Sequence, residues 1–485
     1  MDALRAGRAV TVTPYWVAGK PRTSDSPVTV RSPYDAAVTG VTSNATAEDI
    51  EEAVAAAAAA RDEVAALPAH VRANALDHVS RRLDERLDEV AALITGESGK
   101  PITWARTEVT RAVATFRWGA EEARRFSGSV QRLDTDPGSE DRVALVRQVP
   151  RGPVLGITPF NFPVNLVAHK LAPAIAAGCP VIIKPAPATP LSALLLGELL
   201  AETDLPAGAW SVLPMTNEQI AGMVGDPRLP VISFTGSDAV GWRINDANPR
   251  KHVLLELGGN APVIVAPDWS DIPGAATRVA AFGMHQAGQS CVSVQRVYAH
   301  TDIYDEFVPA LVDGVRALGT GDPADPDTHV GPLINADAAR RVSGWVADAV
   351  SRGATLLTGG RTNGNAIDPV VLADVPEGCA VVTEEVFGPV IVVERVSSVD
   401  EAITQANKSR YGLQAGVFTH DLRVAAHTTA KLQVGGVIIG DVPTYRADQM
   451  PYGGIKDSGV GREGVHSAMV DLTEPKVMVL TEFLA

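Results

Sequence analysis

The sequence predicts an α/β protein built around a doubly wound parallel sheet. Three short runs rich in β-branched residues, 154–158, 181–184 and 231–235, each end at Pro or Gly and are followed by Ala- and Leu-rich sequence. A strand, a turn and a helix in repeated succession are typical of parallel sheets covered by helices. Strands and helices also alternate from about 258 to 442, which predicts a second α/β domain.

Length and composition narrow the class of protein. The 485 residues are enough for two or three domains, and 46% apolar with 20% charged residues is typical of a folded globular chain. The net charge of −15 argues against a nucleic-acid partner, because such partners are held by clustered Lys and Arg.

The cysteines and the N-terminal sequence indicate a reducing compartment. Cys179, Cys291 and Cys379 cannot all pair, and none has the close spacing of a zinc or redox motif, so we expect no metal site. The N-terminus has no signal-peptide pattern, and no run of 18 uncharged apolar residues follows it. We therefore expect a cytoplasmic protein that does not enter a membrane.

Two helices are expected before the first strand of the sheet. Thr46 and Asp49 have the spacing of a capping box, and strong helix formers follow them. Apolar residues at helical spacing predict a second helix over about 71–95, which stops near Gly96 and Gly99. Both helices are predicted to be amphipathic and to lie on the surface.

Polar residues follow each of the three predicted strands. Asn161, Lys184 and Ser237 lie there, and ligands of such sheets bind beyond the carboxyl ends of the strands. Gly236 and Gly241 flank a turn whose amides can receive a pyrophosphate, although their spacing is not that of a dinucleotide fingerprint or a P-loop. Taken singly, each also fits a simpler role: a turn residue, a solvated strand end or a glycine turn.

Cys291 and Glu256 together indicate covalent catalysis. A lone cysteine is more often a small buried hydrophobe than a nucleophile. A thiol that attacks a carbonyl and a carboxylate that activates water would divide one difficult reaction between them. Glu256 ends the apolar run VLLEL, where poor solvation raises a carboxyl pKa, unless it is simply part of a salt bridge.

Seven motifs follow one another along the chain. They are PFNFP with Asn161, IIKPA with Lys184, FTGS with Ser237, ELGGN with Glu256, GQSC with Cys291, EEVFGPV with Glu385 and Phe387, and PYGGIKDSGVGREG near the C-terminus. In this order they resemble the aldehyde dehydrogenase superfamily over essentially the whole chain. The resemblance implies NAD(P)-dependent oxidation of an aldehyde to a carboxylic acid. Glu256 implies the non-acylating branch, because members that transfer the acyl group to coenzyme A generally lack this glutamate.

The resemblance also implies roles for individual residues. Cys291 would form a thiohemiacetal and then a thioester, Asn161 and the Cys291 backbone N–H would hold the oxyanion, and Glu256 would activate water. The cofactor, NAD or NADP, would be bound by Thr158, Pro159, Lys184, Gly236, Ser237, Gly241, Glu385 and Phe387. Pro187 stands where many NAD-preferring relatives carry a glutamate that binds the ribose, which makes NADP use a hypothesis.

The implied fold has three parts. Residues 8–127 and 150–257 would form a cofactor domain of modified Rossmann type, and 258–455 a catalytic α/β domain. A β-hairpin at 128–149 with the C-terminal segment 456–485, including a strand at 476–484, would assemble a homodimer or homotetramer. The alternative is that the hairpin is only a surface excursion of a monomer.

The sequence says least about the aldehyde. Arg111, Asn165, Ser290 and Arg446 are candidates for the substrate site, and an arginine pair would favour a short polar or anionic, semialdehyde-like aldehyde. The same arginines also fit surface salt bridges. Two other functions compete: a cysteine-dependent acyl hydrolase or transferase, for which His285 would be the nearby base, and a noncatalytic scaffold that retains the fold.

Overall fold

The computed structural model describes residues 12–481, so residues 8–11 of the predicted cofactor domain and 482–484 of the predicted last strand lie outside it. The first sheet has eight strands in the order β2-β1-β9-β8-β7-β10-β11-β23. Their bounds are Lys20–Arg22, Tyr15–Val17, Trp210–Val212, Val181–Lys184, Val154–Ile157, Val231–Thr235, His252–Glu256 and Gly459–Val460. Strands β9, β8, β7, β10 and β11 are parallel, and the strand order reverses between β7 and β10, where such sheets bind ligands.

The three predicted strands are confirmed. Strands β8 and β10 have the predicted bounds, and β7 ends one residue earlier, at Ile157. Helices cover both faces of this sheet, which is why β7 and β8 are buried along their whole length and are continuously apolar up to Lys184. The covering helices are α6 (Asn165–Ala177), α7 (Leu191–Ala201), α8 (Asn217–Val224) and α9 (Asp238–Ala247), with the N-terminal helices and α16 (Val465–Asp471).

The N-terminal helices correct the prediction in one respect. The capping box is present: Asp49 N donates to Thr46 Oγ1 at 3.1 Å, and Thr46 N donates to the Asp49 carboxylate at 3.2 Å. Each predicted helix is, however, two helices. The first divides into α1 (Ala47–Ala59) and α2 (Arg61–Ala66), and the second into α3 (Ala69–Glu85) and α4 (Leu87–Ser98).

The break in the second helix falls at Arg86, whose backbone leaves the helical conformation. Its φ is −107° and its ψ is 20°, and its guanidinium pairs with Glu89 and Glu198. A single non-helical residue leaves the apolar spacing on either side nearly intact, so periodicity does not reveal it. Helix α3 also lies deeper than expected, because α5 (Ile102–Arg125) packs over it.

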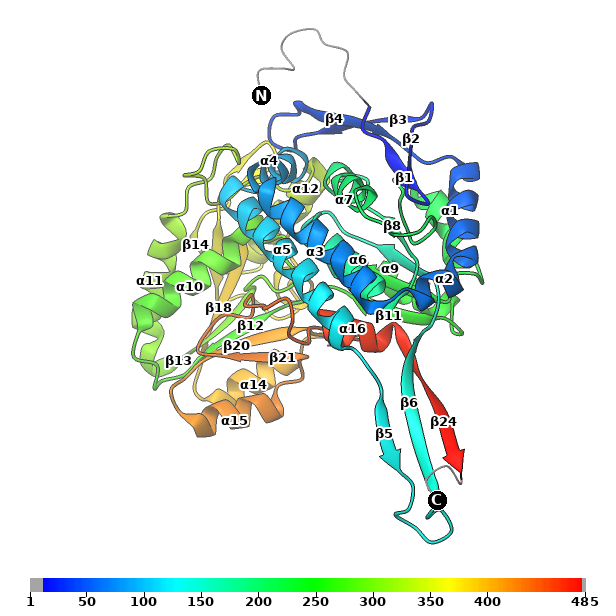
Figure 1. Ribbon diagram of the computed structural model, residues 1–485. Helices are drawn as coiled ribbons and strands as arrows, with labels where there is room; N and C mark the ends of the chain where they lie inside the picture. The colour runs from blue at the N-terminus through cyan, green and yellow to red at the C-terminus, as the bar shows by residue number, and fades with distance from the viewer. Residues whose placement is uncertain (1–11, 482–485) are drawn as a thin grey trace.

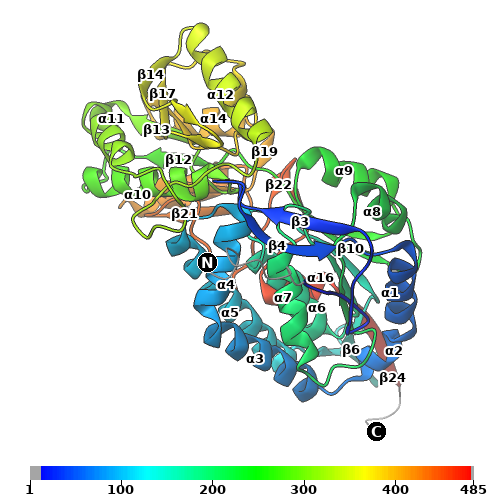
Figure 2. The ribbon, with the colours of Figure 1, turned by 90° about the horizontal axis from the view of Figure 1, so that it is seen from above.

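The second sheet confirms the second α/β domain. Its order is β14-β17-β18-β13-β12-β20-β21, and all neighbours except β14 and β17 are parallel. The strands are Thr355–Thr358, Val370–Ala373, Val390–Val396, Arg296–His300, Pro262–Val265, Gln414–Phe418 and Gly436–Ile439. Its helices are α10 (Ile272–Met284), α11 (Thr301–Arg316), α12 (Ala336–Ser351), α13 (Ala380–Thr383), α14 (Val399–Asn407) and α15 (Leu422–Lys431). This domain lies beside the first (Figure 2).

A third sheet projects from the body of the molecule (Figure 1). Strand β6 (Arg142–Pro150) is its centre, with β5 (Ser129–Arg132) and β24 (Thr473–Thr481) antiparallel on either side. The hairpin strands lie within 129–150, and the last strand begins at Thr473, earlier than the predicted 476. Its apolar side chains Val130, Val477, Met478 and Val479 are at least half exposed.

Part of the predicted C-terminal segment belongs structurally to the first sheet. Strand β23 pairs with β11 at Glu256, and α16 packs against α5 and α6. There are also three two-stranded antiparallel sheets: β3 (Pro27–Arg31) with β4 (Val38–Ser43), β15 (Thr362–Asn363) with β16 (Ala366–Ile367), and β19 (Tyr411–Gly412) with β22 (Ile455–Lys456). Between residues 12 and 481, no helix has the length and apolar character needed to cross a membrane.

Candidate active site

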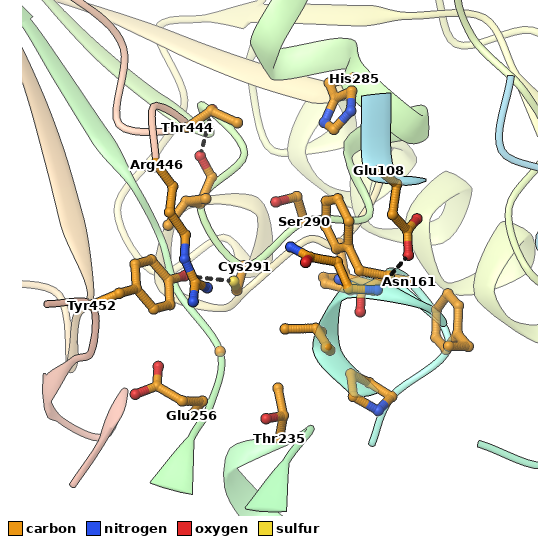
Figure 3. A pocket seen from close by; sticks show the side chains of 18 of the residues that line it. Glu108, Asn161, Thr235, Glu256, His285, Ser290, Cys291, Thr444, Arg446 and Tyr452 are labelled. Carbon is orange, nitrogen blue, oxygen red and sulfur yellow. Dashed lines mark hydrogen bonds between the residues drawn. The ribbon is translucent and has the colours of Figure 1, made fainter. Parts of the chain in front are cut away.

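A cavity of about 540 Å³ is lined by residues of both α/β domains and of α5 (Figure 3). This volume is in the range of small-molecule and cofactor sites. The cavity brings together most of the predicted site residues: Arg111, Pro159, Asn161, Asn165, Gly236, Ser237, Glu256, Ser290, Cys291, Glu385, Phe387 and Arg446. Thr158, Lys184 and Gly241 lie outside its lining.

The loop before Cys291 has an unusual backbone. Gln286, Ala287 and Gly288 are consecutive left-handed residues, with φ of 52°, 56° and 69°. A side chain at Gly288 would clash with the carbonyl oxygen of Gly388, so this position requires glycine. Left-handed non-glycine residues are strained and persist where surrounding contacts hold them. Here the Gln286 side chain donates to the backbone oxygen of Asn161, which ties the two loops together.

Asn161 approaches the Cys291 loop from the end of β7. Its Nδ2 donates to Gln289 O at 2.9 Å, and its buried Oδ1 has no hydrogen-bond partner among the described residues. A carboxamide nitrogen carries two hydrogens. One hydrogen takes part in the bond to Gln289, and Nδ2 carries a second.

The Cys291 thiol is partly buried and has one neighbour that was not predicted. Its Sγ lies 3.0 Å from the hydroxyl oxygen of Tyr452 (Figure 3). Burial raises the pKa of this thiol to about 12, with further contributions from Glu385 and Glu256, while Tyr452 and Arg446 act in the opposite direction. The thiol form therefore predominates at neutral pH until a group accepts its proton.

Glu256 lies at the end of β11 beside a second buried carboxyl group, Glu463. Burial raises the Glu256 pKa well above its ordinary value, and the Glu463 charge raises it further. Burial also opposes ionisation of Glu463, but Arg446 and Lys170 outweigh it and hold the Glu463 pKa at about 2. Of the two carboxyl groups, Glu463 is therefore the one that ionises more readily.

A small space connects these two groups. A cavity of about 20 Å³ is bordered by Glu256, Glu463 and Lys170, which is room for about one water molecule. Glu256 Oε2 and Glu463 Oε1 are buried there without hydrogen-bond partners among residues 12–481, and Lys170 Nζ lies 3.6 Å from Glu463 Oε1. These three groups therefore border one small polar space.

Both predicted arginines are salt-bridged and also line the main cavity. The Arg111 guanidinium donates two hydrogen bonds, of 2.8 and 3.3 Å, to the Asp448 carboxylate. The Arg446 guanidinium lies 3.0 Å from the Glu463 carboxylate and 3.9 Å from the centre of the Tyr452 ring. We expected the two arginines to be either surface ion pairs or pocket residues. Instead, they form ion pairs and also line the pocket, because their salt bridges lie in the cavity wall.

The groups predicted for the cofactor include several free polar atoms. Lys184 is buried at the end of β8, where burial lowers its pKa to about 8, and Thr158 Oγ1 is buried without a partner in the described chain. Ser237 precedes α9 but makes no capping bond to it, and Glu385 accepts the Gly259 N–H at 3.0 Å. Unsatisfied hydroxyl and ammonium groups at strand ends fit the ribose and phosphates of a dinucleotide.

A family model described as the aldehyde dehydrogenase family matches residues 16–478. The chain belongs to this family. It is 40% identical to the 3-sulfolactaldehyde dehydrogenase of Priestia aryabhattai over 96% of this chain and 97% of that protein.

Two solved structures extend the comparison. Aldehyde dehydrogenase 21 of Physcomitrella patens, in complex with the reaction product succinate, matches with a TM-score of 0.96 and 42% identity over 98% of this chain and 99% of that one. An NADP complex of glyceraldehyde-3-phosphate dehydrogenase from Methanocaldococcus jannaschii matches with a TM-score of 0.89 and 33% identity, over 95% and 100%. The predicted family and fold class are confirmed, and the protein is an NAD(P)-dependent aldehyde dehydrogenase.

The hydrolase alternative lacks its base in this aldehyde dehydrogenase. The His285 ring lies 4.2 Å from the Trp104 ring, burial lowers the His285 pKa to about 3, and its Nδ1 is buried without a partner among the described residues. The hydrogen-bond partner of Cys291 Sγ is Tyr452, not a histidine. In residues 12–481, no three His, Cys, Asp or Glu side chains are grouped so as to hold a metal ion.

Sequence reasoning missed Tyr452, Glu463 and the Lys100–Glu108 pair. Tyr452 and Glu463 lie in the quoted motif PYGGIKDSGVGREG, but glycine was its most visible feature. Lys100 and Glu108 are fully buried against each other, and Glu108 accepts the N–H groups of Val164 and Asn165 behind the Asn161 loop. A charged residue on a helix is usually solvated, so the sequence carried no signal for this pair.

Proposed function

We propose that this aldehyde dehydrogenase uses Cys291 as its nucleophile, Asn161 as its oxyanion donor and Glu256 as its general base. The observation that carries the proposal is the convergence of these three side chains on one cavity from three separate strand ends and loops. The Cys291 thiol loses its proton to water in the cavity and the sulfur adds to the aldehyde carbonyl carbon. The Asn161 amide and the Cys291 N–H stabilise the resulting oxyanion. NAD(P), held by the residues at the strand ends, would supply the hydride acceptor, and loss of hydride from the Cys291 adduct would leave a thioester.

Glu256 then acts on water. Because burial raises its pKa, Glu256 is a strong base once it has lost its own proton. Glu256 lines the main cavity, so that proton can first pass to water in the cavity. Water loses a proton to Glu256, the hydroxide attacks the thioester, and the carboxylic acid leaves with Cys291 restored.

Replacing Glu256 with Gln should separate the two halves of the reaction. We expect the first turnover to produce NAD(P)H and the following turnovers to slow by about 100-fold or more, because general-base catalysis of deacylation is lost. Stopped-flow absorbance measures both phases, with Glu384→Gln as the matched control. Cys291→Ala, in contrast, should abolish both the first-turnover burst and the later turnovers. An unchanged steady-state rate in Glu256→Gln would remove this role.

A short aldehyde with an anionic tail is the substrate that the charges of the cavity favour. Arg446 and Lys170 both lie beside the Glu463 carboxylate, while the neighbouring Glu256, whose pKa is raised, ionises less readily. Arg446 Nε is buried without a partner among the described residues, and Arg111 adds a second guanidinium to the wall. Guanidinium groups bind carboxylates, sulfonates and phosphates strongly. The sulfolactaldehyde and semialdehyde dehydrogenases among the relatives, and the succinate complex, support this substrate class.

Arg111→Met should lower kcat/KM for a semialdehyde such as succinic semialdehyde by about 10- to 100-fold, because a charged hydrogen bond is lost. The same variant should alter turnover of neutral butanal by less than about threefold. Arg106→Met on the same helix, outside the cavity, is the control. Equal losses for the charged and the neutral aldehyde would contradict an anion-binding role.

NADP is the proposed cofactor. Pro187 offers no carboxylate to a ribose 2′-OH. Lys184 is close to it in sequence and is buried at the end of β8. An adenosine 2′-phosphate would thus meet no acidic side chain at position 187. The NADP complex of the related glyceraldehyde-3-phosphate dehydrogenase is consistent with this choice.

Kinetics with both cofactors tests the preference. We expect kcat/KM to be about tenfold or more higher for NADP, and Pro187→Glu to reverse the order by placing a carboxylate against the 2′-phosphate. Thermal stabilisation by each cofactor, measured without aldehyde, checks binding separately from turnover. A strong preference of the unaltered enzyme for NAD would show that another group selects the ribose.

We also propose that the enzyme is a cytoplasmic homodimer or homotetramer that assembles through the projecting sheet. Val130, Val477, Met478 and Val479 expose apolar surface there, away from the body of the subunit. Such a patch is unfavourable in water unless another surface covers it. Light scattering of the purified enzyme would report a single-subunit mass if the sheet were only an excursion.

A further inference from the structure

Tyr452 is held firmly within the active site. Its backbone N–H donates to Glu463 O at 3.0 Å, and its carbonyl oxygen accepts the Glu463 N–H at 2.6 Å. The Arg446 guanidinium lies over its ring, 3.9 Å from the ring centre, and the residue is only 4% exposed. The backbone and the ring are therefore fixed, and the hydroxyl group has a defined position.

The Tyr452 hydroxyl group lies next to the sulfur atom of Cys291. The hydroxyl oxygen of Tyr452 lies 3.0 Å from Cys291 Sγ, at hydrogen-bond distance for an O–H and a sulfur atom (Figure 3). A phenol can donate to a thiolate, whereas in the resting thiol either atom can be the donor. Glu256, Glu385 and Arg446 are the charged groups that act on this sulfur. The two carboxyl groups oppose a negative sulfur, and Arg446 reaches it across the Tyr452 ring.

We propose that Tyr452 is a further catalytic residue, whose hydroxyl group donates a hydrogen bond to the Cys291 thiolate when the sulfur attacks and again when it leaves. The proposal rests on the role proposed for Cys291. It assigns Tyr452 to the sulfur, whereas Asn161 serves the oxygen of the substrate.

The two sulfur steps are balanced without proton loss from tyrosine. In the attack, a sulfur lone pair forms the C–S bond and the carbonyl π pair moves to oxygen, so the negative charge leaves the sulfur and the Tyr452 bond weakens. In deacylation, hydroxide adds to the thioester carbon, the C–S bond breaks, and its electron pair returns to the sulfur facing the Tyr452 O–H. Burial raises the Tyr452 pKa well above its ordinary value, so the phenol keeps its proton throughout.

A bound donor has two opposing effects on a nucleophile. For each unit by which the donor lowers the pKa of the thiol, the thiolate fraction rises tenfold. A more stable thiolate is, however, intrinsically less reactive. On a logarithmic scale, the loss of intrinsic reactivity is roughly half as large as the gain in thiolate fraction. For a thiol that titrates above neutral pH, the donor therefore accelerates attack overall, and it also improves the sulfur as a leaving group.

Tyr452→Phe tests the assignment, because it removes the hydroxyl group and keeps the ring beneath Arg446. The rate of Cys291 alkylation by iodoacetamide is measured against pH without cofactor or aldehyde, with the modified site identified by mass spectrometry. We expect the midpoint of the profile to rise by about one pH unit and the neutral-pH rate to fall about threefold. Tyr298→Phe, at a buried tyrosine outside the cavity lining, should leave the profile unchanged.

The measurement distinguishes this proposal from the proposed function. A profile that coincides with that of the unaltered enzyme would overturn the role of Tyr452, even if Cys291→Ala abolished turnover. If Cys291→Ala retained aldehyde oxidation, the role of Cys291 would fail whatever the alkylation profile showed. Should Tyr452→Phe fold poorly, Tyr452→Trp provides a second variant without the hydroxyl group, and an unshifted profile there would equally overturn the proposal.

Discussion

The burial of Glu256 beside Glu463 is the constraint on which the active site depends. Two carboxyl groups in one apolar region cannot both ionise at low cost, because desolvation and mutual repulsion act together. Arg446 and Lys170 decide which of them ionises, since both face Glu463. The Glu256 pKa is thereby raised at the edge of the main cavity, while Glu463 stays ionised beside the two cations. The general base and the anion site that we propose would thus share one physical origin.

The fold brings these groups together from distant parts of the chain. Lys170 comes from α6, Glu256 from the end of β11, and Glu463 from the C-terminal segment that returns through β23 to pair with β11. Tyr452 and Glu463 are joined by their backbones, so the same return places the phenol against Cys291. The C-terminal segment therefore contributes to the candidate active site and also leads to the projecting strand β24.

The sequence could predict those features whose cause is local. Strands β8 and β10 were found to the residue because a strand buried on both faces is a continuous apolar run bounded by Pro or Gly. The Thr46–Asp49 capping box and the motif residues on strand ends were visible for the same reason. The non-helical residue Arg86 was not, because it leaves the apolar spacing around it undisturbed. Contacts such as Tyr452 with Cys291, or Glu463 with Glu256, join segments far apart in sequence and are created by packing, which no local pattern records.

The protonation state of Glu256 tests this account most directly. Infrared spectroscopy of the ligand-free enzyme labelled with ¹³C-glutamate, titrated with pH and compared with Glu256→Gln, isolates the carboxyl band of this residue. We expect a protonated carboxyl band that persists at neutral pH in the unaltered enzyme and is absent from the variant. A carboxylate at neutral pH that titrates near the ordinary value of 4.5 would contradict the account, because Glu463 and burial would then have no effect on the base.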